Sequence, residues 1–571
     1  MVISHSKISH SITTAMISSI KYSIERILSI ALLSLLLGGC SGINFTSKDN
    51  QGSAYNGMAE FFEEWRAFRK APAVDGVPDF SAETMKAQHK QLASWQRRLN
   101  KFPKNEWSVS AQIDWHLVRA EMNGLDFDHR VLRPWERDPA YYVYFYPDFT
   151  DVPNREGPMI EGSIQAAYYE YPLSRADADE IKAGLDIIPA LYEQARVNLT
   201  GNARDLWLKG IQSIREQSDA LDAFSNEITR NHSALATSVR QAQKASDEFA
   251  EWLEAQAPGK NGPSGVGKEH YTWALKNIHY VNLTWEEEVV LVKRELARAH
   301  TALRLEENRN RRLPNLQKID TEREYNRRLN GAVDEYMAFL EEEEILPIKA
   351  YMDQALRERI GKFSPSRGLR GFFDEINYRD ELPMRTHGNH WFDLARMREE
   401  PHASPIRQTP LWYNIFDGRA EGMATGMEEM MMHAGLFDNR PQARELVWIL
   451  LAQRAARALG GLYQHGNEMN LEEAARFADK WTPRGYLPWN GSTIQHEQHF
   501  YLRQPAYGES YVIGKIEIER LLAEYARQRE NTFTVYNFMD EFNNSGMIPV
   551  SLINWELNGD RTEIDDIMGR Q

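Results

Sequence analysis

The sequence predicts a mainly all-α fold with an N-terminal and a C-terminal helical half. Apolar residues recur at helical spacing along nearly the whole chain, and the alternating pattern of half-buried strands is scarce. Residues 258–268 interrupt this pattern with a cluster of Pro, Gly, Ser and Asn. We therefore expect helical halves at residues 55–257 and 269–571, joined by this loop; the alternative is a long loop within one domain.

The N-terminus has the pattern of a bacterial lipoprotein signal. Lys21 and Arg26 precede an apolar run of about 11 residues, which is too short for a bilayer span of about 20. Two glycines follow this run, and the next residue is Cys40, the only cysteine of the chain. This order is typical of a signal that is cleaved before a lipidated cysteine.

We therefore predict that residues 1–39 are removed, that Cys40 is lipidated and that residues 40–54 form a polar tether. Acyl chains on Cys40 would anchor the protein to a membrane of the cell envelope. Because the residue directly after Cys40 is Ser41 and not Asp, bacterial sorting favours the outer membrane, with the protein facing the periplasm or the exterior. A membrane-anchoring helix with a chance cysteine is the alternative interpretation.

Capping signals and apolar periodicity locate helices in the C-terminal half. Thr284 with Glu287, and Asn470 with Glu473, have the spacing of capping boxes at helix starts. The expected helices span residues 285–305, 441–459, 470–480 and 507–529. The pair Gly460-Gly461 is expected to end the second of them.

Two aromatic-rich stretches, Trp135–Phe149 and Tyr486–Tyr501, carry few helical signals. We expect ordered loops or short strands at both places. Long ordered loops in compact proteins are often functional.

Composition excludes several classes of site and partner. The chain has 67 Lys and Arg against 82 Asp and Glu, a net charge of −15, which argues against nucleic acid as a partner. With one cysteine, no disulfide can form within the chain, and a Cys-ligated zinc site is excluded. Any metal must therefore be bound by His, Asp or Glu.

Three segments of the C-terminal half concentrate polar residues, at 385–393, 419–433 and 503–515. His387 and His390 are three residues apart, so a helix would place both imidazoles on one face, close enough to share a metal. Glu421 on a neighbouring helix would complete three ligands and leave a fourth position for water, as in catalytic zinc sites. The alternative is that both histidines are ordinary loop or core residues.

Two tyrosines of the third segment share a helix face. Tyr507 and Tyr511 are four residues apart, and a tyrosine hydroxyl in a pocket can donate to an oxyanion or act as an acid. In the second segment, Glu428 and Glu429 are expected on a solvated helix face. The methionines around them are expected to fill the core.

Other catalytic motifs are missing or imperfect. The run His496–His499 resembles a zinc motif, but its histidines are three apart where H-E-x-x-H requires four. We expect a polar loop there. The sequence contains no G-x-S-x-G elbow, no Walker loop and no G-x-G-x-x-G.

Four stretches occur in an order and spacing that resemble one bacterial family. They are Glu269–Glu287, Ala420–Ala424 (Ala-Glu-Gly-Met-Ala), Gln453–Arg457 (Gln-Arg-Ala-Ala-Arg) and Gln504–Lys515. Over roughly residues 55–557, the chain resembles the family called domain of unknown function 885. The resemblance implies a large helical, metallopeptidase-like architecture, because members are related to gluzincin peptidases and are often lipoproteins.

The resemblance also implies roles for individual residues. It makes His390 a metal ligand, Glu421 the Glu of the second helix, and Tyr511 the tyrosine near the reacting carbonyl. The family typically has a His-Glu pair where this chain has Pro383-Met384. The general base and one ligand are therefore missing.

Other residues could replace the missing pair. His387 could replace the lost ligand because it lies one turn from His390. Nothing obvious replaces the lost base, and the candidates by proximity in sequence are Asp393, Glu381 and Glu428.

Three functions are compatible with these residues. A peptidase-like hydrolase would bind zinc at His387, His390 and Glu421, and Tyr511 or Arg419 would stabilise the oxyanion. A lyase or other enzyme acting on acidic saccharides would neutralise the sugar carboxylate with Arg and move protons with His or Tyr. Its residues would come from His387, His390, His402, Arg407, Arg419, Tyr507 and Tyr511. A non-catalytic lipoprotein that binds a ligand or partner would explain the loss of the His-Glu pair.

Overall fold

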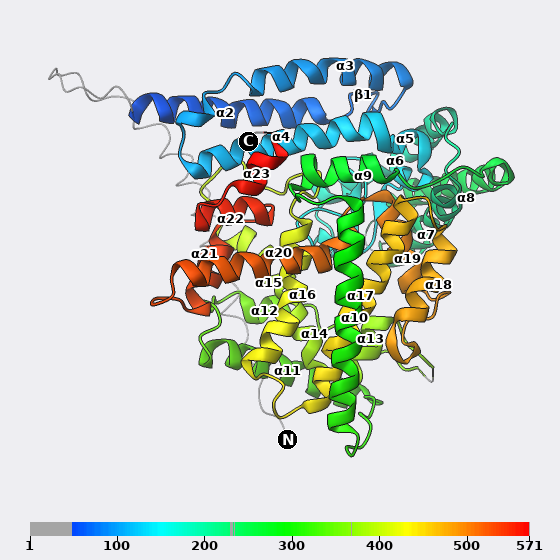
Figure 1. Ribbon diagram of the computed structural model, residues 1–571. Coiled ribbons are helices and arrows are strands. Elements are labelled where there is room, and N and C mark those ends of the chain that lie inside the picture. The colour runs from blue at the N-terminus through cyan, green and yellow to red at the C-terminus, as the bar shows by residue number, and fades with distance from the viewer. Residues whose placement is uncertain (1–47, 229–231, 233, 367, 570–571) are drawn as a thin grey trace, which may run out of the picture. The chain divides into compact units, whose positions relative to one another are not determined.

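Residues 48–228, 232, 234–366 and 368–569 are described by a computed structural model of the chain (Figure 1). Helices make up most of the described chain, and its strands form two two-stranded sheets, which confirms the mainly all-α fold. The predicted signal and Cys40 lie outside the described residues. None of the described helices combines the length and the apolar character that a membrane crossing requires.

The N-terminal part contains seven described α-helices and both small sheets. The helices are α2 (Lys48–Arg69), α3 (Ala82–Leu99), α4 (Val109–Phe127), α5 (Pro134–Arg137), α6 (Arg175–Asn198), α7 (Arg204–Ile228) and α8 (Leu235–Gln256). Strand β1 (Ala73–Val74) pairs antiparallel with β2 (Val77–Pro78), and β3 (Phe145–Tyr146) pairs parallel with β4 (Ile164–Gln165). Short 3-10 turns are η1 (Lys104–Glu106), η3 (Pro139–Tyr142), η4 (Ala166–Tyr168) and η5 (Ala257–Gly259). A π-helical turn, η2 (Asp128–Leu132), extends α4.

The C-terminal part is built from helices alone among the described residues. They are α9 (Lys268–Ala274) with the π-turn η6 (Leu275–His279), α10 (Trp285–Asn310), α11 (Glu322–Glu342), α12 (Met352–Arg357), α13 (Phe372–Asn377), α14 (Leu382–His387), α15 (Asn389–Glu399), α16 (Asp417–Ala434), α17 (Pro441–His465), α18 (Leu471–Trp481), η7 (Pro483–Gly485), α19 (Ser492–Arg503), α20 (Tyr507–Gln528), α21 (Val535–Asn544), α22 (Val550–Asn558) and α23 (Thr562–Ile567).

Residues 54–571 form one compact unit that contains two main apolar cores. The smaller core, between Phe80 and Leu253, joins the inner faces of α6, α7 and α8. The larger core joins α10, α16, α17 and α20, with α10 packed along α17 (Figure 1). That residues 258–268 join an N-terminal and a C-terminal helical half stays a prediction.

The crossing of α16 and α20 is close because glycines line it. A Cβ atom at Gly514 would lie 2.0 Å from the carbonyl oxygen of Gly418, and one at Gly422 would lie 2.4 Å from the carbonyl carbon of Gly514. No larger residue fits where two backbones approach so closely. This crossing brings Glu421 of α16 to Tyr507 in the first turn of α20.

The predicted capping boxes are confirmed. Thr284 and Glu287 exchange side-chain and backbone hydrogen bonds at the start of α10, and Asn470 and Glu473 do so at the start of α18. Each satisfies backbone N–H groups that a helix start leaves without an intrahelical partner.

The expected end of a helix at Gly460-Gly461 is wrong, because α17 continues to His465. A Cβ atom at Gly460 would lie 2.9 Å from Oε1 of Gln498, and one at Gly461 would lie 2.9 Å from Oε1 of Glu509. These glycines therefore make room for α19 and α20 against the middle of α17.

The two aromatic-rich stretches differ in their secondary structure. Trp135–Phe149 contains the short strand β3, as expected, but also most of the short helix α5 and the 3-10 turn η3, which were not expected. Tyr486–Tyr501 was expected to be a loop or strand, and this is wrong for its second part, which belongs to α19. Ile494, Gln498 and Tyr501 recur at helical spacing and are fully buried. The run His496–His499 is therefore helical rather than a polar loop.

Candidate metal centre

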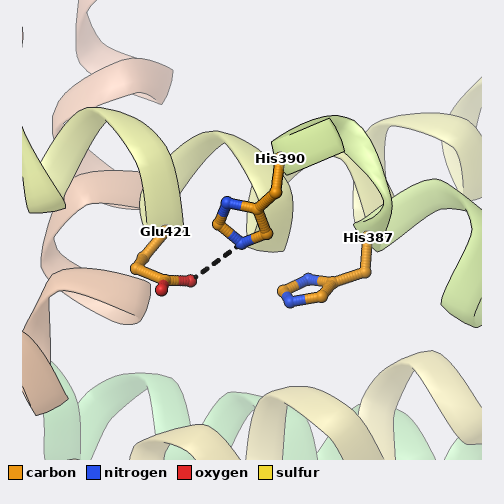
Figure 2. Close-up of side chains that lie close together, drawn as sticks. All are labelled: His387, His390 and Glu421. Carbon is orange, nitrogen blue, oxygen red and sulfur yellow. Dashed lines mark ion pairs between the residues drawn. The ribbon is translucent and has the colours of Figure 1, made fainter. Parts of the chain in front are cut away.

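The three predicted ligands come together where α14, α15 and α16 meet. His387 ends α14, His390 lies in the first turn of α15, and Glu421 lies in the second turn of α16. One ligand atom from each residue lies within 4.8 Å of the other two (Figure 2). The histidines do not share one continuous helix, because Gly388 separates α14 from α15.

His390 and Glu421 face each other in the interior. Nε2 of His390 lies 3.1 Å from Oε2 of Glu421, and both side chains are almost fully buried. Burial disfavours charge on both groups, yet their mutual attraction raises the pKa of His390 to about 9 and lowers that of Glu421 to about 2.

The same two atoms indicate a missing third partner. Neither Nε2 of His390 nor Oε2 of Glu421 has a hydrogen bond of good geometry among the described residues. Both atoms are buried, lack such a bond and face the same space. A cation bound between them would provide the missing partner. Two imidazoles and one carboxylate, with a fourth position for water, are a donor set that suits zinc. The residues present therefore fit a metal.

His387 is oriented by two residues of the neighbouring helices α16 and α17. Its Nδ1 lies 3.2 Å from Oε1 of Glu428 and 3.1 Å from Nη2 of Arg454. Arg454 also donates two hydrogen bonds of 2.7 Å to Glu428. Burial and the charge of Arg454 lower the pKa of His387, so the ring is neutral. A guanidinium can only donate, so the contact with Arg454 requires the lone pair of His387 on Nδ1. Binding of a ligand at Nε2 requires the other tautomer, in which Nδ1–H is directed to Glu428 instead.

The two predicted tyrosines lie beside Glu421. The hydroxyl of Tyr507 donates to Oε1 of Glu421, and the hydroxyls of Tyr507 and Tyr511 are 3.0 Å apart. Burial and the charge of Glu421 raise the pKa of both phenols well above the ordinary value. Both therefore remain protonated and can act as hydrogen-bond donors.

Arg419 does not join this cluster. It lies two residues before Glu421 on α16, so it faces nearly the opposite side of that helix. Its guanidinium pairs with Asp393 and donates to Asn543 at 2.9 Å. Among the predicted catalytic residues, the fold thus gathers Tyr507 and Tyr511 but not Arg419.

The expectation that Glu428 and Glu429 are solvated is wrong. Glu428 is 1% exposed and Glu429 is 8% exposed. Glu429 pairs with Arg298 at 2.6 Å and with Lys515 at 3.0 Å, whereas Glu428 pairs with Arg454. Cations on α10, α17 and α20 compensate these charges, and single-sequence periodicity cannot reveal such partners. The neighbouring Met427, Met431 and Met432 are buried, as expected.

The candidate general bases lie in different places. Glu381 pairs with Arg328 and Arg440, and Asp393 pairs with Arg419. Only Glu428 of the three contacts a predicted ligand, His387.

Sequence reasoning missed several residues of the site. Arg454 and Arg457 belong to the stretch Gln453–Arg457, which carried a family likeness but no assigned role. The guanidinium of Arg457 lies 4.4 Å from the centre of the Tyr511 ring and pairs with Glu497 at 2.7 Å. Two arginines within a mainly apolar helical stretch are the sequence signal that could have identified them.

Asp151 was also missed. It lies on the segment between β3 and β4, and its charge adds to burial and to Glu421 in raising the pKa of Tyr507 and Tyr511. Among the described residues, no ion pair involves its carboxylate. Nothing in the local sequence distinguishes this aspartate from an ordinary loop residue.

The residues named for a saccharide-acting enzyme do not all gather. Arg407 is buried in ion pairs with Asp114 and Glu556, and His402 accepts a hydrogen bond from the backbone N–H of Ser404. Only the subset His387, His390, Tyr507 and Tyr511 lies at the centre described above.

Solved structures of similar fold exist. A candidate lipoprotein of unknown function from Shewanella oneidensis superposes with a TM-score of 0.64 and 15% identity, covering 89% of this chain and 98% of its own. A candidate lipoprotein from Colwellia psychrerythraea superposes with a TM-score of 0.59 and 14% identity, covering 90% of this chain and 99% of its own. At this identity, the likeness establishes the fold alone.

Sequence comparison gives the family. No curated protein matches the chain. The family model described as bacterial protein of unknown function (DUF885) matches residues 67–364, which is more than half of the chain. This range includes Glu269–Glu287, the first of the four stretches that carry the family resemblance. It ends before the other three stretches and before the candidate metal centre. On the extent of this match, the chain belongs to the DUF885 family of bacterial proteins.

Proposed function

We propose that this protein is a metal-dependent hydrolase of the cell envelope that acts on peptide-like substrates. The observation that carries this proposal is the convergence of His387, His390 and Glu421 within 4.8 Å in a buried site. A zinc ion held there would polarise a carbonyl and lower the pKa of a water molecule.

Residues around the ligands have separate tasks in this proposal. Glu428 accepts from Nδ1 of His387, 3.2 Å away, in the metal-binding tautomer, and Arg454 holds Glu428 in place through two hydrogen bonds of 2.7 Å. The protonated hydroxyl of Tyr511 donates to the oxyanion that forms on the substrate carbonyl. Tyr507 donates to Glu421 and so fixes the direction of that carboxylate.

Asp151 is the general base that we propose in place of the lost Glu. Glu428 is less suitable because Arg454 holds it in two hydrogen bonds and keeps its pKa low despite burial. Asp151 has no ion-pair partner among the described residues, and its charge acts on Tyr507, Tyr511 and His390. A carboxylate of this kind can accept a proton from an attacking water.

We further propose that the protein is anchored in the cell envelope, in the outer membrane, through acyl groups on Cys40. The charged residues, apolar run and cysteine of the N-terminus support this location. The two structural relatives, which are themselves candidate lipoproteins, also support it.

The proposed activity is tested with the full-length protein in detergent and a library of quenched fluorescent peptides. We expect chelator-sensitive cleavage that His390→Ala and Glu421→Gln abolish, while Tyr511→Phe lowers kcat about a hundredfold through loss of one oxyanion donor. The matched control is His300→Ala, since His300 lies on α10, away from the three ligands, and contacts Trp481 through its carbonyl at 2.9 Å and its ring. Cleavage that none of the three site variants changes would rule out this site.

A non-catalytic binding protein is the second candidate, and one observation favours it. In the absence of metal, His390 and Glu421 form an ion pair that partly compensates their burial. A chain that binds no metal and cleaves no peptide, but has the same fold, would support this second function.

A further inference from the structure

A separate cavity of about 300 Å³ lies beside α4 and the turn η6, which pack against each other. This volume is at the lower end of the range of about 300–1,000 Å³ that small-molecule sites occupy. Its wall is mainly apolar and aromatic and includes the rings of Phe127, Trp135, Tyr141 and Tyr413. None of the residues of the candidate metal centre lines it.

Two π-helical turns border this cavity. The turn η2 carries Asp128 after α4, and η6 carries His279 after α9, and both residues line the wall. Each turn is followed by a residue in the left-handed region, Arg133 with φ 42° and Tyr280 with φ 55°. Such turns and such backbone strain are found preferentially at functional sites, where the surrounding fold maintains them.

The cations in the wall are already paired. Arg69 lies 2.7 Å from Glu161 and stacks on Trp412, Lys70 lies 2.8 Å from Glu161, and Arg503 pairs with Asp138 at 2.6 Å. Burial lowers the pKa of His279 to about 4, so its ring is neutral. Among the described residues that line the cavity, no unpaired positive charge is left for an anionic ligand.

Asp128 differs from these paired cations. Among the described residues, no hydrogen bond or ion pair involves its carboxylate, although the side chain lies in the wall of the cavity. Burial raises its pKa to about 8, and the more distant charge of Arg69 offsets this only in part. A carboxyl group in such surroundings lacks a counter-charge, which a ligand can supply.

We propose that this cavity binds a small organic cation, a protonated amine carried on an apolar or aromatic body. The ammonium group would pair with the carboxylate of Asp128, and the faces of Tyr141 and Trp135 would contact the cation and the ring of the ligand. This site is independent of the proposed hydrolase centre, so either can fail without the other.

Calorimetric titration of the full-length protein tests the proposal with three probes of one shape. These are 2-phenylethylamine, which is cationic, 2-phenylethanol, which is neutral, and 3-phenylpropionate, which is anionic. We expect saturable binding of the amine at about tenfold or more higher affinity than the alcohol, as one charge-assisted hydrogen bond provides, and no binding of the anion. Equal affinity for amine and alcohol, or no saturable binding of the amine, would overturn the proposal. This test needs only the wild-type protein.

A pair of variants locates the binding. Asp128→Asn keeps the shape of the side chain and should reduce amine affinity about tenfold or more while leaving alcohol binding unchanged. Asp126→Asn is the control, because Asp126 lies two residues away on α4, pairs with Arg130 and His89, and does not line the cavity. Amine affinity that Asp128→Asn leaves unchanged would assign the binding to another place and contradict the proposed site.

Discussion

At the residue scale, Glu421 is the point at which the features of the candidate metal centre meet. Its two oxygens face different partners, since Oε2 faces His390 at 3.1 Å and Oε1 accepts from Tyr507. A buried carboxylate so constrained has little freedom to turn. Its position, and that of the ring of His390, is therefore set before any ligand arrives.

Glu428 provides a prediction at this scale. Replacing it by Gln keeps the shape of the side chain but removes the negative acceptor that faces Nδ1 of His387 at 3.2 Å. We expect zinc affinity to fall about 10- to 100-fold, as for other residues that orient metal-binding histidines. Competition titration with a chromophoric chelator measures this affinity. The adjacent Glu429→Gln is the control, since Glu429 pairs with Arg298 and Lys515, and an equal loss there would contradict the assigned role.

Asp128 gives a prediction for pH dependence. Its pKa is about 8 in the folded protein against 3.8 as the ordinary value, so between these pH values the folded state holds a proton that the unfolded state releases. Stability from this group is therefore present at low pH and lost as pH rises toward 8. The free energy of unfolding of Asp128→Asn, relative to that of wild type, should therefore increase with pH, by at most about 1.4 kcal/mol per pH unit. Urea unfolding at pH 5, 6 and 7.5 measures this difference, and a constant difference would contradict it.

At the element scale, the crossing of α16 and α20 positions the site. Gly418, Gly422 and Gly514 let the two backbones touch, and the contact between Glu421 and Tyr507 depends on that approach. These glycines thus act through helix packing rather than through chemistry.

Gly514→Ala tests this packing. Its Cβ would lie 2.0 Å from the backbone oxygen of Gly418, which cannot move alone, so we expect destabilisation by about 3 kcal/mol and loss of the Tyr507–Glu421 contact. Gly426→Ala on α16 is the control, because nothing lies within 4 Å of its added Cβ, and it should be neutral or up to about 1 kcal/mol stabilising. Denaturant unfolding compares the two variants. Equal stabilities would show that α16 and α20 do not pack so closely.

The starts of α10 and α18 could be predicted from local sequence, whereas the end of α17 and the whole of α19 could not. The capping boxes at Thr284 and Asn470 are local hydrogen-bond patterns, so the sequence itself reveals them. Gly460-Gly461 looks like a helix end, but it serves close packing against Gln498 and Glu509, which lie far along the chain. Local sequence cannot distinguish these two uses of glycine.

At the scale of the whole molecule, the convergence of distant segments is the central result. Residues 387, 390, 421, 507 and 511 could be named from residue type, spacing and family resemblance, and the fold gathers all of them. Arg454, Arg457 and Asp151 could not be given roles, because each acts on residues that lie far away in the sequence, the two arginines by contact and Asp151 by its charge. The family match ends at residue 364, so the geometry of the site rests on the structure alone.

The metal content of the purified full-length protein shows whether His387, His390 and Glu421 hold an ion. Elemental analysis after reconstitution with zinc should give about one equivalent per chain for wild type, as a site with three protein ligands holds one ion, and a large loss in His390→Ala. Less than about a tenth of an equivalent in folded wild type, with none gained when zinc is added, would show that these residues do not form a metal centre.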